Sequence, residues 1–214
     1  MIRHRFSRSR QQSAATRKRR LVLVRVAGWS LACAAALFVG AAVAPSTAFA
    51  QGGSSQALER SVKAAFLYKF LGYADFPAAA FADSAAPVTI GVVGSEEMAA
   101  ELARVVSGRQ VHGRPIVVRT LREGDPAQVH LLFVAGSDSA RTARILRAAL
   151  AIPATALLTV TECELGLQSG SVINFRIIEE RVRFDVSLDS AERNNVKLSS
   201  RLLTVANRVV KGNS

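Results

Sequence analysis

Few side chains after the first 50 residues have the chemistry needed for catalysis or metal binding, chiefly Cys163, His112 and His130. A thiolate beside an imidazole is an activated nucleophile, and neighbouring strands would bring Cys163 close to His130. However, no acidic residue is placed to orient the imidazole, and no oxyanion motif is recognisable. A zinc site needs more ligands at closer spacing. We therefore expect no enzyme, no metal and no cofactor, with His130 a half-buried strand histidine and His112 in a surface turn.

Phosphate-binding loops are also missing. The apolar run at residues 88–93 ends in Gly91-Val92-Val93-Gly94, which is neither a dinucleotide-binding motif nor a P-loop with its lysine. We interpret it as a plain strand-to-helix turn, although such a helix N-terminus can hold an anion.

The stretch at residues 170–210 carries the clearest pattern. If Glu179–Glu180 is a turn, three apolar pairs face each other on one side of an antiparallel hairpin: Ile177 with Val182, Phe175 with Phe184, and Ile173 with Val186. The opposite, outward face then carries Asn174, Arg176, Arg183, Asp185 and Ser187.

Arg176 would lie directly opposite Arg183, which destabilises a sheet unless something offsets the two charges. Two interpretations stay open: Asp185 and Glu179 offset them, or the face binds an anion or an acidic partner. Candidate residues for such binding are Arg176, Arg181, Arg183, Arg193 and Lys197. Tyr68 and Tyr73 lie off the apolar face that begins in the first predicted helix, Tyr73 just after the end of that helix, and are candidates for a partner surface.

Residues 1–50 have the organisation of a secretory signal peptide. A basic head precedes an apolar run at residues 26–44 and an Ala48-Phe49-Ala50 end, so cleavage is expected after Ala50. An uncleaved anchor is the alternative. Arg19-Arg20 raises the twin-arginine route beside the general one. The expected location is a bacterial periplasm.

The net charge of +12 belongs largely to this leader. Nine of the 28 Lys and Arg residues lie in the first 25 positions, whereas all 16 acidic residues come later. The high charge is therefore no evidence for nucleic-acid binding. Loss of Cys33 with the leader leaves Cys163 alone, either buried or free to form an intermolecular disulfide.

After a flexible lead-in at residues 51–56, a single domain is expected over 57–211. Apolar strands alternate with helices, which predicts an α/β fold with a mixed, mostly parallel sheet flanked by helices. The C-terminal hairpin extends this sheet or packs beside it, and two helices follow. The link at 121–128 is too short for a helix, so that unit runs antiparallel or crosses over on an extended loop. The expected helices are 57–71, 96–107, 138–150, 189–194 and 199–211; the expected strands are 88–93, 116–120, 129–134, 156–161 and the hairpin.

Several segments in this order resemble one known family. They are KAAFLYKF at 63–70 followed by Phe76-Pro77, IGVVG at 90–94, LTVT at 158–161, the hairpin with VRFDV at 182–186, and KLSSRLL at 197–203. Together they resemble the YfiR family of periplasmic proteins over roughly residues 58–209.

The resemblance implies a non-enzymatic negative regulator. Such proteins bind the periplasmic sensor domain of a membrane diguanylate cyclase and repress it, which lowers cyclic-di-GMP and restrains biofilm formation. It also implies a homodimer and a second partner, an OmpA-like outer-membrane lipoprotein. Two departures are Ser187, where the family usually has Asn, and the lone Cys163, which rules out the family's intramolecular disulfides. The alternative hypothesis is a periplasmic small-ligand-binding module.

Overall fold

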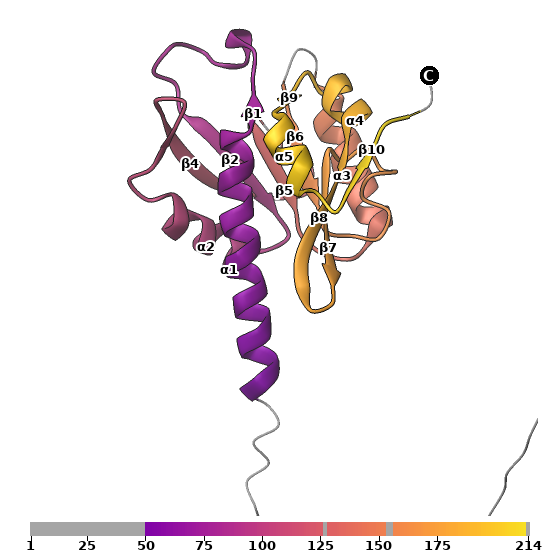
Figure 1. Cartoon of the computed structure of the whole chain (residues 1–214). Helices are drawn as coiled ribbons and strands as arrows, with labels where there is room; N and C mark the ends of the chain where they lie inside the picture. The colour runs from indigo at the N-terminus through magenta and orange to yellow at the C-terminus, as the bar shows by residue number, and fades with distance from the viewer. Residues whose placement is uncertain (1–49, 126–127, 153–155, 213–214) are drawn as a thin grey trace, which may run out of the picture. The chain divides into compact units, whose positions relative to one another are not determined.

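The computed structural model describes residues 50–125, 128–152 and 156–212, which belong to the unit Ser46–Ser214 (Figure 1). The predicted signal peptide lies outside the described residues, apart from Ala50. Within the described ranges, no helix combines the length and apolar character needed to cross a membrane.

A mixed, mostly parallel sheet forms the centre of the described unit, in the order β10-β8-β7-β6-β5-β2-β4-β3. Strands β2, β5 and β6 are buried along their whole length, as expected for strands covered on both faces. The α/β fold class is therefore confirmed. The strands are β2 (Val88–Val93), β3 (Gln110–Val111), β4 (Arg114–Leu121), β5 (Leu131–Val134), β6 (Leu158–Thr161), β7 (Ile173–Ile178), β8 (Arg181–Ser187) and β10 (Arg208–Val210), with β1 (Ala74–Asp75) and β9 (Lys197–Leu198) paired separately.

Helices cover both faces of the sheet. Helices α1 (Ala50–Gly72) and α2 (Glu96–Val106) share one core with alternate strand residues, and α3 (Ser139–Leu150) packs on the other face. Side chains cap the N-termini of α2 and α3: Ser95 Oγ accepts the Met98 N–H at 3.1 Å and Asp138 Oδ1 accepts the Arg141 N–H at 2.9 Å. The short helices are η2 (Ala78–Ala80), α4 (Leu188–Arg193) and α5 (Ser200–Val205).

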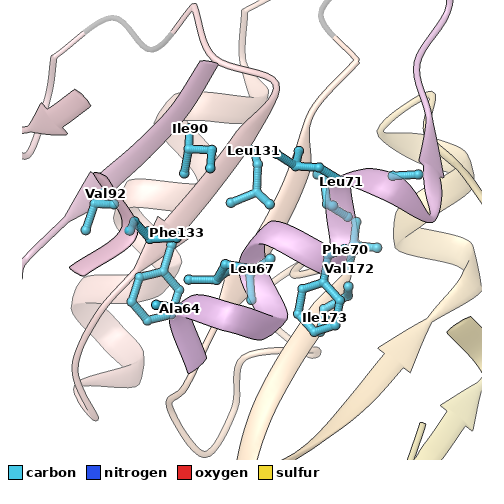
Figure 2. Close-up of a cluster of buried hydrophobic side chains, with 14 of the residues drawn as sticks. Ala64, Leu67, Phe70, Leu71, Ile90, Val92, Leu131, Phe133, Val172 and Ile173 are labelled. Atoms are coloured by element: carbon cyan, nitrogen blue, oxygen red, sulfur yellow. The ribbon is translucent and has the colours of Figure 1, made fainter. Parts of the chain in front are cut away.

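Helix α1 lies across the sheet and supplies much of the main core. Figure 2 shows Ala64, Leu67, Phe70 and Leu71 turned toward the strands. All four are at most 1% exposed. Their spacing puts them on one side of the helix, so burying that side fixes α1 against the sheet. They meet Ile90, Val92, Leu131, Phe133, Val172 and Ile173.

Residues 51–56 are helical, which corrects the prediction of a flexible lead-in and a helix starting at Ala57. A helix that is already nucleated gains one hydrogen bond for each residue added, so its docked half can template these turns despite their weak propensity. Residues 53–58 are exposed, and this end of α1 projects beyond the strands in Figure 1.

The chain crosses over from β4 to β5 with no helix in the described residues 122–125 and 128–130. Both strands run parallel to β2, one on each side of it. The antiparallel alternative is therefore wrong. A crossover without a helix works here because His130 N donates to Thr89 O at 2.9 Å and sets the start of β5 directly beside β2.

The C-terminal segment differs from the prediction. The last helix ends at Val205, and Val209 lies in β10, which pairs in parallel with β8. Helical spacing was misleading there, because the β-branched pair Val209-Val210 favours a strand and Asn207 N donates to Phe184 O at 2.8 Å. Helix α4 begins at Leu188, one residue before the predicted start, and Ser187 caps it, since Ser187 Oγ accepts the Ser190 N–H.

The β7–β8 hairpin has the predicted register, including Ile177 opposite Val182 and Phe175 opposite Phe184. Glu179 and Glu180 both have positive φ, 49° and 59°, as a two-residue turn with the twist of a hairpin requires. The hairpin extends the sheet, because β7 pairs in parallel with β6.

The predicted outward face is correct only at the tip. Asn174, Asp185 and Ser187 are buried, which corrects their assignment to solvent. Asn174 accepts the Thr161 hydroxyl at 2.7 Å and donates to Cys163 O at 3.0 Å. The base of the hairpin is covered because the loop after β6 folds over it.

We expect Gly166→Ala to destabilise the protein, because a Cβ at Gly166 would lie 2.2 Å from Thr161 Oγ1 and 2.3 Å from Asn174 Oδ1. Overpacking of this kind costs about 1–3 kcal/mol, or roughly 5 °C in Tm at this size. Thermal unfolding measures it. Gly72→Ala is the matched control, since nothing lies within 4 Å of its Cβ position; equal Tm changes would contradict the packing argument.

Candidate functional site

Four phenylalanines anchor the hairpin to α1. The Phe70 and Phe184 ring centroids are 4.9 Å apart, those of Phe66 and Phe184 5.6 Å, and those of Phe70 and Phe175 5.7 Å. Offset and edge contacts at these distances are favourable beyond the area that they bury. The cluster holds the hairpin at a fixed position beside the helix.

Beyond this cluster the hairpin becomes exposed on both faces. We call residues 176–183 the hairpin tip. Ile177 is 51% exposed and Ile178 is 37% exposed, which is unusual for large aliphatic side chains on a strand. Arg176, Arg181 and Arg183 are exposed as well. The tip therefore presents apolar and cationic groups together.

Neither acidic residue that was predicted to offset the arginine pair at the tip forms an ion pair with it within the described ranges. Glu179 lies in the turn and is paired with neither arginine. Asp185 is buried, accepts from Asn207 Nδ2 at 2.7 Å and pairs with Arg208 at 3.1 Å. The hypothesis that Asp185 offsets Arg176 and Arg183 is therefore wrong. Within the described ranges, Arg183 forms no ion pair, and Arg176 has a 3.5 Å contact with the Glu164 carbonyl oxygen.

Arg193 and Lys197 do not join this group. They follow β8, at the end of the hairpin opposite the tip, where Arg193 Nη2 donates to Ser190 Oγ at 3.0 Å and Lys197 lies in β9. The prediction that they reinforce the arginine face is corrected, because α4 turns the chain away from the tip.

The two tyrosines are half-buried and belong to different surroundings. Arg109 lies over the Tyr68 ring, 5.0 Å from its centroid, and both tyrosines pack against the main core. Tyr73 O also accepts the Ser199 N–H at 2.9 Å. Neither residue lines the hairpin tip, and their role in partner binding remains a prediction.

Cys163 is buried, with 1% of its surface exposed. The prediction of a buried thiol is confirmed, and this burial disfavours an intermolecular disulfide, which stays an untested prediction. Cys163 follows β6, whereas His130 precedes β5, and these strands are parallel. Cys163 therefore lies beyond the C-terminal ends of these neighbouring strands and His130 at their N-terminal ends, so the two side chains form no nucleophile pair.

His130 holds the loop that follows α1 against the sheet. Its Nδ1 accepts the Thr89 N–H at 3.0 Å, which leaves Nε2 to donate to Ala80 O at 3.0 Å. Its ring stacks on the Phe81 ring, with 4.4 Å between the two centroids. Arg114 Cζ also lies over the Phe81 ring, 3.8 Å from its centroid. The predicted half-buried histidine is confirmed. His112 lies in the β3–β4 turn, as predicted, with Nε2 3.3 Å from Leu71 O.

Burial lowers the pKa of His130, and the charge of Arg114 lowers it further, against the opposing effect of the Ala80 carbonyl. Folding then favours the neutral ring, so its contribution to stability is present at neutral pH and is lost as pH falls below about 6.5. We expect His130→Gln to lower Tm at pH 7.5 and to do so less at pH 5. A Tm difference from wild type that does not change with pH would contradict this.

A buried ion pair was not foreseen from the sequence. Lys63 Nζ donates to Glu162 Oε2 at 2.6 Å and also contacts Glu59, while Glu162 Oε1 accepts the Gly136 N–H at 2.7 Å. Burial by itself would lower the pKa of Lys63, but the two carboxylates outweigh it and the pKa is raised. The signal that could have shown it is helical spacing. Lys63 precedes the buried Leu67 and Leu71 by four and eight residues, which places it on the buried side of α1.

No group of side chains in the described ranges could hold a metal ion. The surface formed by the hairpin tip and the adjoining part of α1 presents exposed apolar and cationic groups, which suits contact with another molecule. A family model described as YfiR/HmsC-like matches residues 60–207, most of the chain after the predicted leader. The chain belongs to the YfiR/HmsC-like family. A comparison with curated proteins gives no match.

The match includes most of α1, the hairpin and every strand of the sheet except β10. The resemblance inferred from the sequence segments is thus confirmed. Membership of the YfiR/HmsC-like family indicates a regulator in cyclic-di-GMP signalling at the level of the diguanylate cyclase.

Proposed function

We propose that the protein is an exported periplasmic regulator that binds the periplasmic sensor domain of a membrane diguanylate cyclase and represses it. Repression lowers cyclic-di-GMP and restrains biofilm formation. The observation that carries the proposal is the YfiR/HmsC-like match across residues 60–207. The exposed apolar and cationic hairpin tip supports it as a surface for a protein partner.

The proposal includes export by the signal peptide at residues 1–50, with cleavage after Ala50. It also includes a homodimer and sequestration by an OmpA-like outer-membrane lipoprotein, which would free the cyclase by mass action. Competition between the lipoprotein and the cyclase for one surface would give such a switch without any chemical step.

Deletion of the gene tests the repressor role. We expect cyclic-di-GMP and biofilm to rise, and a copy of the wild-type gene to restore both. A copy lacking residues 1–50 is the matched control, because it makes the same domain without export and should fail to restore them. Unchanged cyclic-di-GMP after deletion would overturn the repressor role, and full restoration by the leaderless copy would overturn the periplasmic location. Mass spectrometry of the exported protein, expected to begin at Gln51, checks the cleavage.

A further inference from the structure

A groove lies between the first half of α1 and the hairpin tip, and we call it the α1–hairpin groove. It has a volume of about 800 Å³, against 260 to 370 Å³ for the other described cavities. Its walls are mainly apolar: Leu58, Val62 and Phe66 from α1, and Ile177 and Val182 from the hairpin.

The sequence builds the helix wall by regular spacing. Leu58, Val62 and Phe66 recur every four residues, so they continue along α1 the stripe that Phe70 completes in the core. Phe66 contacts Phe184 and is half-buried, whereas Leu58 is 65% exposed because α1 extends past the end of the hairpin contact. The apolar stripe on α1 therefore extends beyond the part of the helix that the hairpin covers.

The floor of the groove is fixed before any partner arrives. Phe66 rests on Phe70 and Phe184, and the hairpin is joined to β6 by pairing of its base. A preformed apolar floor loses little conformational entropy when it is covered, which favours docking over local rearrangement.

The rim of the groove carries unpaired cations. Arg181 and Arg183 line it, and neither forms an ion pair within the described ranges. Of the two acidic residues that line it, Glu59 is already paired with Lys63, and Glu180 lies in the turn itself. The charge that is free to act on an occupant is therefore mainly positive, which selects for acidic groups in it.

These features distinguish between occupants. A second copy docking through a two-fold axis would bring the cationic rims of both copies into one interface, which like-charge repulsion opposes. An amphipathic helix fits better: its apolar face fills a groove with anchors at helical spacing, and acidic residues on its flank meet the arginines. We propose that the α1–hairpin groove docks an amphipathic helix with an acidic flank from a protein partner. The proposal rests on the proposed function, which supplies that partner as the periplasmic sensor domain of the cyclase.

Binding of purified residues 51–214 to the purified sensor domain, measured by calorimetry, tests the groove. We expect Leu58→Glu and Ile177→Glu each to weaken binding at least tenfold, and Leu58→Lys to weaken it less, because the partner is acidic. Arg183→Glu should weaken binding and reduce its salt dependence. Val205→Glu is the control, since Val205 is 62% exposed but lies in α5, and it should change the affinity less than twofold. Thermal unfolding confirms that each variant is folded.

The outcomes separate the two proposals. Wild type that does not bind the sensor domain overturns the proposed function and the groove's partner with it. Wild type that binds while Leu58→Glu and Ile177→Glu bind equally well overturns the groove alone. Conversion of a dimer into a monomer by Leu58→Glu, with sensor binding kept, assigns the groove to a second copy and overturns the helical partner. If Leu58→Lys weakens binding to the sensor domain more than Leu58→Glu does, the proposal that the docked helix has an acidic flank is overturned.

Discussion

Phe70→Ala is expected to lower the free energy of unfolding by about 3–5 kcal/mol, which corresponds to roughly 10 °C or more in Tm. Phe70 is 1% exposed and stands between α1 and the hairpin, with Phe66, Phe175 and Phe184 around its ring. Truncation removes these contacts and leaves a cavity that the sheet cannot close, because the register of β7 and β8 holds their rings in place.

Thermal and urea unfolding measure this effect, and Leu58→Ala is the control. Both residues are large and apolar on the same helix, but Leu58 is 65% exposed and its truncation should stay within about 0.5 kcal/mol. The two variants also separate stability from binding, because Leu58→Ala keeps the fold and removes a groove contact. Similar losses of stability in both would mean that the phenylalanine cluster does not hold the hairpin to α1.

Glu162→Leu is expected to cost about 3 kcal/mol, because it leaves the buried Lys63 ammonium with Glu59 alone, which is the more exposed of its two carboxylate partners. It also removes the acceptor of the Gly136 N–H, which is 2.7 Å from Glu162 Oε1. The double variant Lys63→Met with Glu162→Leu should recover part of the loss, since no buried charge then remains unpaired. The shortfall from additivity in urea unfolding gives the coupling between the two side chains.

The control is the ion pair of Arg104 with Glu101 on α2, in which Arg104 is 75% exposed. Solvent weakens such a pair, so Arg104→Met should cost no more than about 0.5 kcal/mol. Because the pKa of Lys63 is raised on folding, the contribution of its pair is present at neutral pH and is lost only in strongly alkaline solution. Additive effects of the two substitutions at pH 7 would contradict a coupled pair.

The sequence determined the local features of this protein. Alternation along residues 173–186 was sufficient to fix the hairpin register, because a shift by one residue would expose Phe175 and Phe184. The caps of α2 and α3, Ser95 and Asp138, are local in the same sense, since a cap satisfies backbone groups only three residues away. The order of apolar strands and helices indicated the α/β class, and the family segments indicated the regulator.

Only the tertiary structure decided which side chains meet. Lys63 and Glu162 are 99 positions apart, and no local pattern indicates that α1 crosses the sheet where β6 ends. Arg193 and Lys197 are close to Arg183 in sequence, yet α4 separates them from the tip. Alternation assigned Asp185 to solvent, but β10 and the loop after β6 cover that face at its base and leave the tip open. The periodicity of apolar residues indicates which side chains share one side of a helix or strand. Whether that side is buried depends on which distant elements pack against it.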